Sequence, residues 1–67
     1  MKAHHVRISW DSQKNKWVVR VEVGAEVIRR YCNHPRNADE QTLRDAAKTT
    51  AIDEGYEIQP ADIEVQR

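Results

Sequence analysis

Hydrophobic and polar residues alternate along two segments near the start of the chain. In residues 4–10 and again in residues 17–23, every second side chain is apolar and the side chains between them are mostly polar. This period of two is typical of a half-buried β-strand, with one face against a core and one face in water. The apolar positions are Val6, Ile8, Trp10, Trp17, Val19, Val21 and Val23.

Turn-forming residues separate these two strands from each other and from a third. Residues 11–16 are a polar loop rich in turn formers. Gly24 and Ala25 fit a two-residue hairpin turn of type II′, which takes glycine first. Residues 26–32 then form the predicted third strand, and Pro35 in the loop that follows prevents its continuation.

A helix is predicted over residues 38–54. Asn37 and Glu40 have the spacing of a capping box, and Gly55 is suited to end the helix in the left-handed conformation. Small residues dominate one helical face, which allows close packing on the sheet; they are Ala46, Ala47, Thr50 and Ala51, together with Leu43. Ile52 lies on the other side of the helix, so we expect it either beneath residues 56–60 or on a second contact surface.

Together these elements predict one α+β domain over residues 1–67, in the order β-β-β-α-β. The first three strands form an antiparallel meander, and the helix packs on its apolar face. Residues 63–67 form a short fourth strand at an edge, with Ile63 and Val65 pointing inward. This strand lies beside either the first or the third.

The two turns also predict the register of the sheet. Val21 falls opposite Ile28, and Trp10 falls opposite Trp17 as a cross-strand pair. The helix-facing side then holds the apolar residues, including Cys32. On the other side a single row across three strands consists of Arg7, Arg20 and Arg29.

Three adjacent arginines need neutralisation, because like charges side by side in a sheet are unfavourable. Glu22 and Glu64 are the candidates within the chain, and a bound anion or the carboxylates of a partner are the candidates outside it. The flanking rows hold His5, Glu22 and Val27 on one side and Ser9, Val18 and Tyr31 on the other. The candidate binding residues are Arg7, Arg20, Arg29, Tyr31, Val18, Val27 and His5.

Composition limits the function classes. The 67 residues carry eleven basic and eleven acidic side chains, so the net charge is zero and a generic nucleic-acid coat protein is disfavoured. No segment has the apolar length of a membrane span or the apolar core of a signal peptide. Cys32 is the only cysteine, which excludes an internal disulfide and favours a reducing, cytoplasmic setting.

Cys32 and His34 are the residues that raise the question of metal binding or catalysis. They are half of a zinc site if His4 or His5 completes it, but the register puts His4 at the opposite end of the sheet. A nucleophilic Cys32 with His34 as base is the other chemical reading. We expect instead a structural thiol, a frayed terminus at His4 and His5, no metal, no cofactor and no enzyme activity.

Four short segments form a recognisable set: Trp17-Val18-Val19-Arg20, Val27-Ile28-Arg29-Arg30-Tyr31, Ala46-Ala47 through Ala51, and Glu54-Gly55. On these segments the chain resembles a bacterial family of short uncharacterised domains, over about residues 6–58. Members have a hairpin with a Trp-x-Val core, a third strand, and an alanine-rich helix that ends in glycine before a last strand. The longer loop at residues 33–37 and the lack of a glycine turn in the last segment depart from this pattern. The resemblance implies the fold and no catalytic residue.

The sequence therefore predicts a small non-catalytic binding module that works through the exposed sheet face. Association with itself, as a homodimer, or with a protein partner is the leading hypothesis. Nucleic-acid or other anion binding by the arginine row is the alternative, and a small thiol enzyme is a third. A merely solvated row, with its side chains splayed into water, is also compatible with the pattern.

Overall fold

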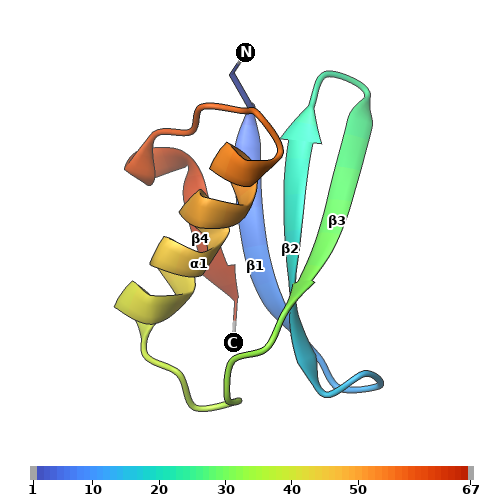
Figure 1. Ribbon diagram of the computed structural model, residues 1–67, viewed down its shortest axis with the longest axis vertical. Coiled ribbons are helices and arrows are strands. Elements are labelled where there is room, and N and C mark those ends of the chain that lie inside the picture. Colours follow the sequence, from blue (N-terminus) through green and yellow to red (C-terminus); the bar gives the residue numbers. More distant parts are fainter. Residues whose placement is uncertain (1, 67) are drawn as a thin grey trace.

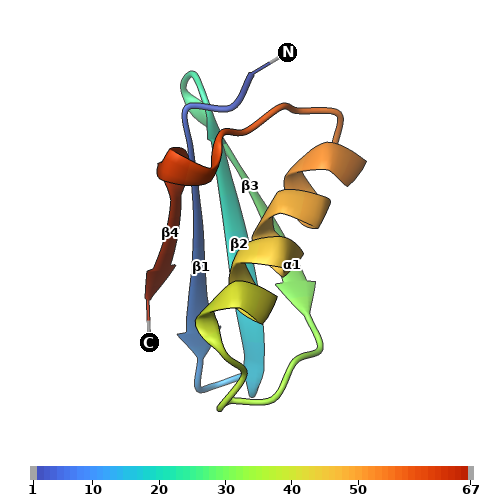
Figure 2. The same ribbon diagram turned by 90° about the vertical axis from the view of Figure 1, so that its left-hand side faces the viewer.

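Four strands form one mixed sheet, and one α-helix covers one of its faces (Figure 1; Figure 2). The structure is a computed structural model that describes residues 2–66. The sheet order is β3-β2-β1-β4, as an α+β fold with three antiparallel strands and an added edge strand. The elements are β1 (His5–Asp11), β2 (Lys16–Val23), β3 (Glu26–Cys32), α1 (Glu40–Asp53), the 3₁₀ helix η1 (Pro60–Asp62) and β4 (Ile63–Gln66).

Strand β4 lies beside β1 and runs parallel to it, which decides between the two edge positions. Val6 of β1 is paired with Ile63. Two residues on, Ile8 is paired with Val65, so β4 extends the apolar face of the sheet beyond β1. Strand β3 is unsuited to the interior of the sheet because its helix-facing side mixes polar with apolar residues, and it forms the opposite edge.

The register of the meander is the predicted one. Val21 is paired with Ile28 across β2 and β3, and Trp10 is paired with Trp17 across β1 and β2. Gly24 has a positive φ of 58° and the φ of Ala25 is not positive, as a type II′ turn requires. The two hairpins therefore agree on which face of β2 is apolar.

The core lies between this apolar face and α1. Its largest fully buried side chain is Trp17, and Leu43, Ala47 and Ala51 of α1 are buried against the sheet. Trp10 meets Trp17 edge to face, with ring centroids 5.5 Å apart and an interplanar angle of 73°. Such a pair adds about 0.5–1.5 kcal/mol beyond its burial. The buried side chains of the sheet are Val6, Ile8, Trp17, Val19, Val21 and Ile63.

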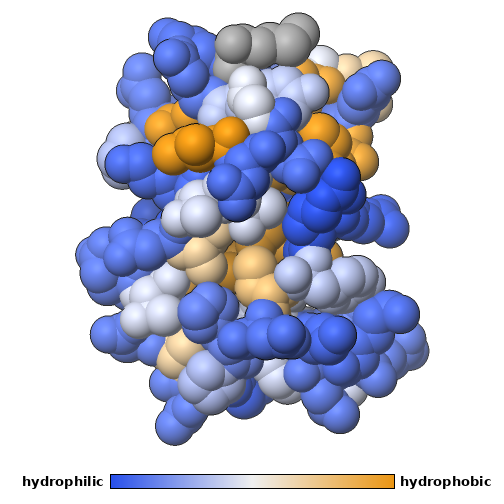
Figure 3. Space-filling view, in the orientation of Figure 1, coloured by the Kyte–Doolittle hydropathy of each residue, from blue (hydrophilic) through white to orange (hydrophobic). Residues whose placement is uncertain are grey.

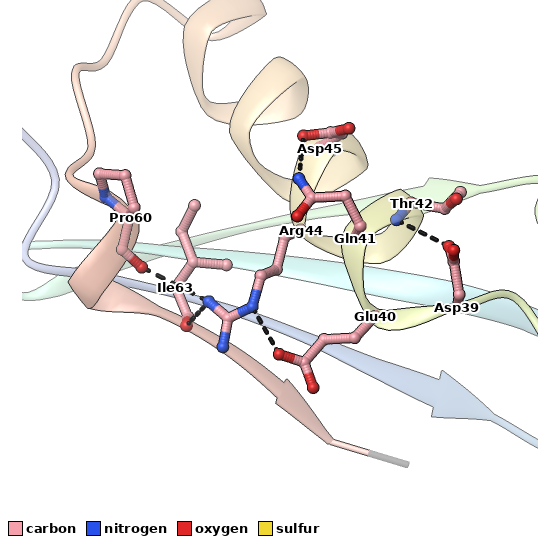
Figure 4. Close-up of polar contacts among 8 residues, drawn as sticks. All are labelled: Asp39, Glu40, Gln41, Thr42, Arg44, Asp45, Pro60 and Ile63. Atoms are coloured by element: carbon pink, nitrogen blue, oxygen red, sulfur yellow. Dashed lines mark hydrogen bonds and ion pairs between the residues drawn. The ribbon is translucent and has the colours of Figure 1, made fainter.

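Helix α1 begins later than predicted, and its cap is Asp39 rather than Asn37. The Asp39 carboxylate accepts a hydrogen bond of 3.0 Å from the backbone N–H of Thr42 (Figure 4). Glu40 does not form the predicted capping box and instead binds Arg44, one turn along. The preceding segment forms a turn before the helix can start, with the Ala38 N–H donating to the carbonyl of Pro35.

The C-terminal end of α1 has the predicted glycine. Gly55 has a positive φ of 90°, and the N–H groups of Gly55 and Tyr56 donate to the carbonyls of Ile52 and Ala51. This is the Schellman arrangement, which satisfies carbonyls that the helix leaves free. Ile52 itself is 56% exposed. It therefore does not lie beneath residues 56–60, and the second contact surface on the outside of the helix stays a prediction.

The N-terminal segment is held in place rather than frayed. Ala3 is buried, and its N–H donates to the carbonyl of Glu57 at 2.9 Å. The His4 N–H donates to the carbonyl of Glu22, and the His5 side chain lies 3.3 Å from Glu64. The expectation of a frayed terminus is thus wrong, because β2 and the chain after α1 both supply backbone partners to this segment.

We predict that Leu43→Ala lowers the free energy of unfolding by about 2–5 kcal/mol, because it opens a cavity in a fully buried site. Ile52→Ala is the matched control on the same helix, and it should change stability by less than about 0.5 kcal/mol because Ile52 is exposed. Urea denaturation measures both. Equal costs for the two variants would contradict this placement of the core.

Candidate binding face

The open face is the side of the sheet opposite α1, and Figure 2 shows that no element of residues 2–66 covers it. Arg7 is paired with Arg20, and Arg20 is paired with Arg29. The three predicted arginines therefore lie in one row across β1, β2 and β3. Glu64 of β4 is paired with Arg7 and ends the row on the other side.

The charges in this row are only partly neutralised. Glu64 lies 3.7 Å from the Nε of Arg7 and 3.3 Å from the Nε2 of His5, so one of the two predicted carboxylates is in place. Glu22 makes no ion pair within the described part of the chain. Among the same residues, the Nε atoms of Arg7 and Arg20 are buried and have no hydrogen-bond partner. The row thus keeps donors that nothing in residues 2–66 satisfies.

Apolar and aromatic side chains flank the arginines on the open face. Val27 and Tyr31 of β3 are 44% and 45% exposed, and Val18 of β2 is half-buried. The Nζ of Lys14 lies 5.6 Å from the centre of the Tyr31 ring, so a cation already covers one side of that ring. A shallow hollow of about 180 Å³ lies where these groups meet, lined by Ser9, Asp11, Val18, Arg20, Arg29 and Tyr31.

Cys32 and His34 lie elsewhere, in a groove of about 400 Å³ between β3 and α1. Figure 3 views this side of the molecule, and apolar surface shows in the middle of the face, among hydrophilic groups. The Cys32 Sγ is 3.8 Å from the Thr50 hydroxyl, and the thiol is free. His4 and His5 lie at the far end of the sheet, and residues 2–66 contain no cluster of three potential metal ligands.

Two arginines outside the row bind carboxylates at the ends of α1. Arg30 of β3 points to the helix side and pairs with Glu54, at 2.9 Å between Nη2 and Oε1 and 3.2 Å between Nε and Oε2. Arg44 binds Glu40 and also donates to the carbonyl of Ile63 in β4 (Figure 4). Sequence reasoning missed both contacts, although the alternation of β3 already separated Arg30 from Arg29.

No family model, curated protein or solved structure matches the chain. The resemblance to short bacterial domains therefore stays a prediction. The structure does show that no helix within residues 2–66 has the length and apolarity required to cross a membrane.

We predict that Arg20→Met raises the free energy of unfolding by about 0.2–1 kcal/mol, because it removes a charge from between two like charges. The gain should shrink in high salt, which screens the repulsion in the wild-type chain. Arg30→Met is the control on the next strand. It should lower stability by up to about 1 kcal/mol, because Arg30 is paired with Glu54. Denaturant titration at two salt concentrations measures the free energy of unfolding of both variants. A loss of stability in Arg20→Met would contradict the repulsion between neighbouring arginines in the row.

Proposed function

We propose that the protein is a non-catalytic binding module whose open face receives the carboxylates of a protein partner. The observation that carries the proposal is the row of Arg7, Arg20 and Arg29, which has one carboxylate, Glu64, for three guanidinium groups. The buried Nε atoms of Arg7 and Arg20 form no hydrogen bond among residues 2–66, although that of Arg7 lies 3.7 Å from Glu64. A ligand that supplies carboxylates to this row removes the repulsion between its guanidinium groups.

Carboxylates suit this row because the guanidinium group presents parallel N–H donors that match two carboxylate oxygens. The apolar neighbours favour a protein over a simple anion. Tyr and Arg are enriched at the centres of protein interfaces, and Val18, Val27 and Tyr31 place contact area beside the charges. A cytoplasmic setting belongs to the same proposal, since Cys32 is a free thiol.

Nucleic-acid binding is the second candidate, with phosphates on the arginine row and a base stacked on Tyr31. Lys14 over the Tyr31 ring favours phosphate contacts and competes with stacking at the same time. A second copy placed face to face is a weaker occupant of the open face, because it brings one arginine row against another.

The test uses two probes of equal net charge, a synthetic peptide rich in Glu and Tyr and a single-stranded oligonucleotide. We expect the peptide to bind more tightly at physiological salt. The triple variant with Arg7→Ala, Arg20→Ala and Arg29→Ala should lose about tenfold or more in peptide affinity, or about 1.4 kcal/mol. Lys48→Ala, a charge removed from the helix side, is the control and should bind like the wild type.

Fluorescence anisotropy at several salt concentrations distinguishes the candidates. Tighter binding of the oligonucleotide, with a steep salt dependence that flattens in the triple variant, would replace the protein partner by a nucleic acid. Binding of neither probe by the wild-type chain would remove both candidates.

A further inference from the structure

Strand β3 leaves one side of its backbone free. It is the outermost strand, it has seven residues, and no element of residues 2–66 lies beyond it (Figure 1). An exposed edge of this length carries a row of unpaired N–H and C=O groups, which form a template for another strand. The edge of β3 therefore offers backbone groups to a further strand, whereas the open face offers side chains.

The hairpin geometry determines which residues of β3 face outward. The pair that flanks a two-residue turn, here Val23 and Glu26, is hydrogen-bonded, and such pairs alternate with pairs that are not. Ile28, Arg30 and Cys32 therefore direct their backbone groups toward β2. The outward backbone groups belong to Val27, Arg29 and Tyr31.

The other edge of the sheet is less accessible. Strand β4 has only four residues, and the guanidinium of Arg44 donates to the Ile63 carbonyl at 2.9 Å (Figure 4). On β3 one outward carbonyl is occupied in a similar way, because Nη1 of Arg30 donates to the carbonyl of Arg29 at 2.8 Å. This contact lies within β3 itself. It uses Nη1, because Nε and Nη2 of the same guanidinium donate to Glu54.

We propose that two copies of the chain associate through β3, as an antiparallel pair with its two-fold axis at Ile28. In this register Val27 of one copy and Arg29 of the other exchange both backbone hydrogen bonds, and the symmetric pair does the same. Ile28 lies opposite Ile28 of the second copy on the helix side, so two half-buried side chains cover each other.

Charge complementarity selects this register. With the axis at Ile28, Glu26 of each copy lies opposite Arg30 of the other copy, so this pair occurs twice in the dimer. The Nη1 of Arg30 then exchanges the Arg29 carbonyl for this carboxylate, while Nε and Nη2 keep Glu54. The freed carbonyl accepts the N–H of Val27 from the second copy.

The two neighbouring registers with outward residues opposed have their axes at Val27 and at Arg29, and neither places Glu26 opposite Arg30. The register with its axis at Arg29 is also disfavoured by charge. It would place Arg29 directly opposite Arg29 of the second copy, and like charges opposite each other in a sheet are destabilising. The favourable contact it offers, Val27 beside Tyr31, does not compensate for that charge pair.

A two-fold axis perpendicular to the sheet keeps both helices on one side and both open faces on the other. The dimer then has one continuous eight-stranded sheet, and the two arginine rows lie on the same surface. This inference rests on the edge of β3 and stands whether or not the open face binds a carboxylate partner. If both hold, the dimer binds a partner with twice the number of contacts.

Sedimentation equilibrium over a wide concentration range tests the association. The wild-type chain should be a reversible dimer, and Glu26→Lys should weaken it about tenfold or more, because it places like charges opposite each other. Asp53→Lys, an equal change of net charge at the exposed end of α1, should leave the dimer intact. A wild-type chain that stays monomeric at the highest concentration, or equal weakening by both variants, would overturn the proposal.

Cysteine cross-linking tests the register. Residues opposite each other in a pair without hydrogen bonds have Cα atoms about 4.5 Å apart, within the range of a disulfide. With Cys32→Ser as background, Ile28→Cys should give a covalent dimer under mild oxidation, and Arg29→Cys should not. Circular dichroism confirms that each variant is folded. Cross-linking of Arg29→Cys in place of Ile28→Cys, or of neither, would overturn the register.

Discussion

Strand β2 is paired on both sides, and its register decides where every other side chain of the sheet lies. Val19 and Val21 face α1 and are fully buried, which requires Val18 and Arg20 to face the other way. A slip of one residue in either hairpin would turn the valines outward and the arginine inward. The core and the arginine row are thus two consequences of one constraint, and neither can be shifted without the other.

The fold follows from the sequence wherever two independent signals agree. The turn at Gly24 and the Trp10–Trp17 pair both place the same face of β2 against the helix, and the structure has that register. The prediction of Asn37 as the N-cap was wrong, because Asn and Asp are both favoured at N-caps and Asp39 lies two residues further on. Local pattern does not say how many residues the preceding turn consumes, and in the structure the Ala38 N–H bonds to Pro35.

The position of β4 depends on contacts between distant segments, which local sequence patterns do not determine. One signal was nevertheless present. Strand β3 carries Glu26 and Arg30 on the side that faces the helix, which suits an edge, whereas Val6 and Ile8 of β1 need cover on both sides. The exposure of Ile52 was harder to foresee, because it depends on the path of residues 56–60.

The arginines of the sheet and of α1 have two kinds of surroundings. Arg30 binds Glu54, the C-cap of α1, and Arg44 binds Glu40 of α1 and the Ile63 carbonyl of β4, so both help to hold the helix to the sheet. Arg20 and Arg29 have no ion pair within residues 2–66, and Arg7 shares Glu64 with His5. The sequence predicted the row, but it did not reveal that its donors stay unsatisfied, because that requires atomic positions.

The most direct test of this account is the nuclear Overhauser effect between Hα protons of facing strands. Arg20 and Arg29 form a pair without hydrogen bonds between them, in which the Cα atoms approach most closely. We expect a strong Hα–Hα effect between Arg20 and Arg29, and another between Val6 and Val21. A strong effect from Arg20 to residue 28 or 30 instead would mean a slipped hairpin and would contradict both the core and the arginine row.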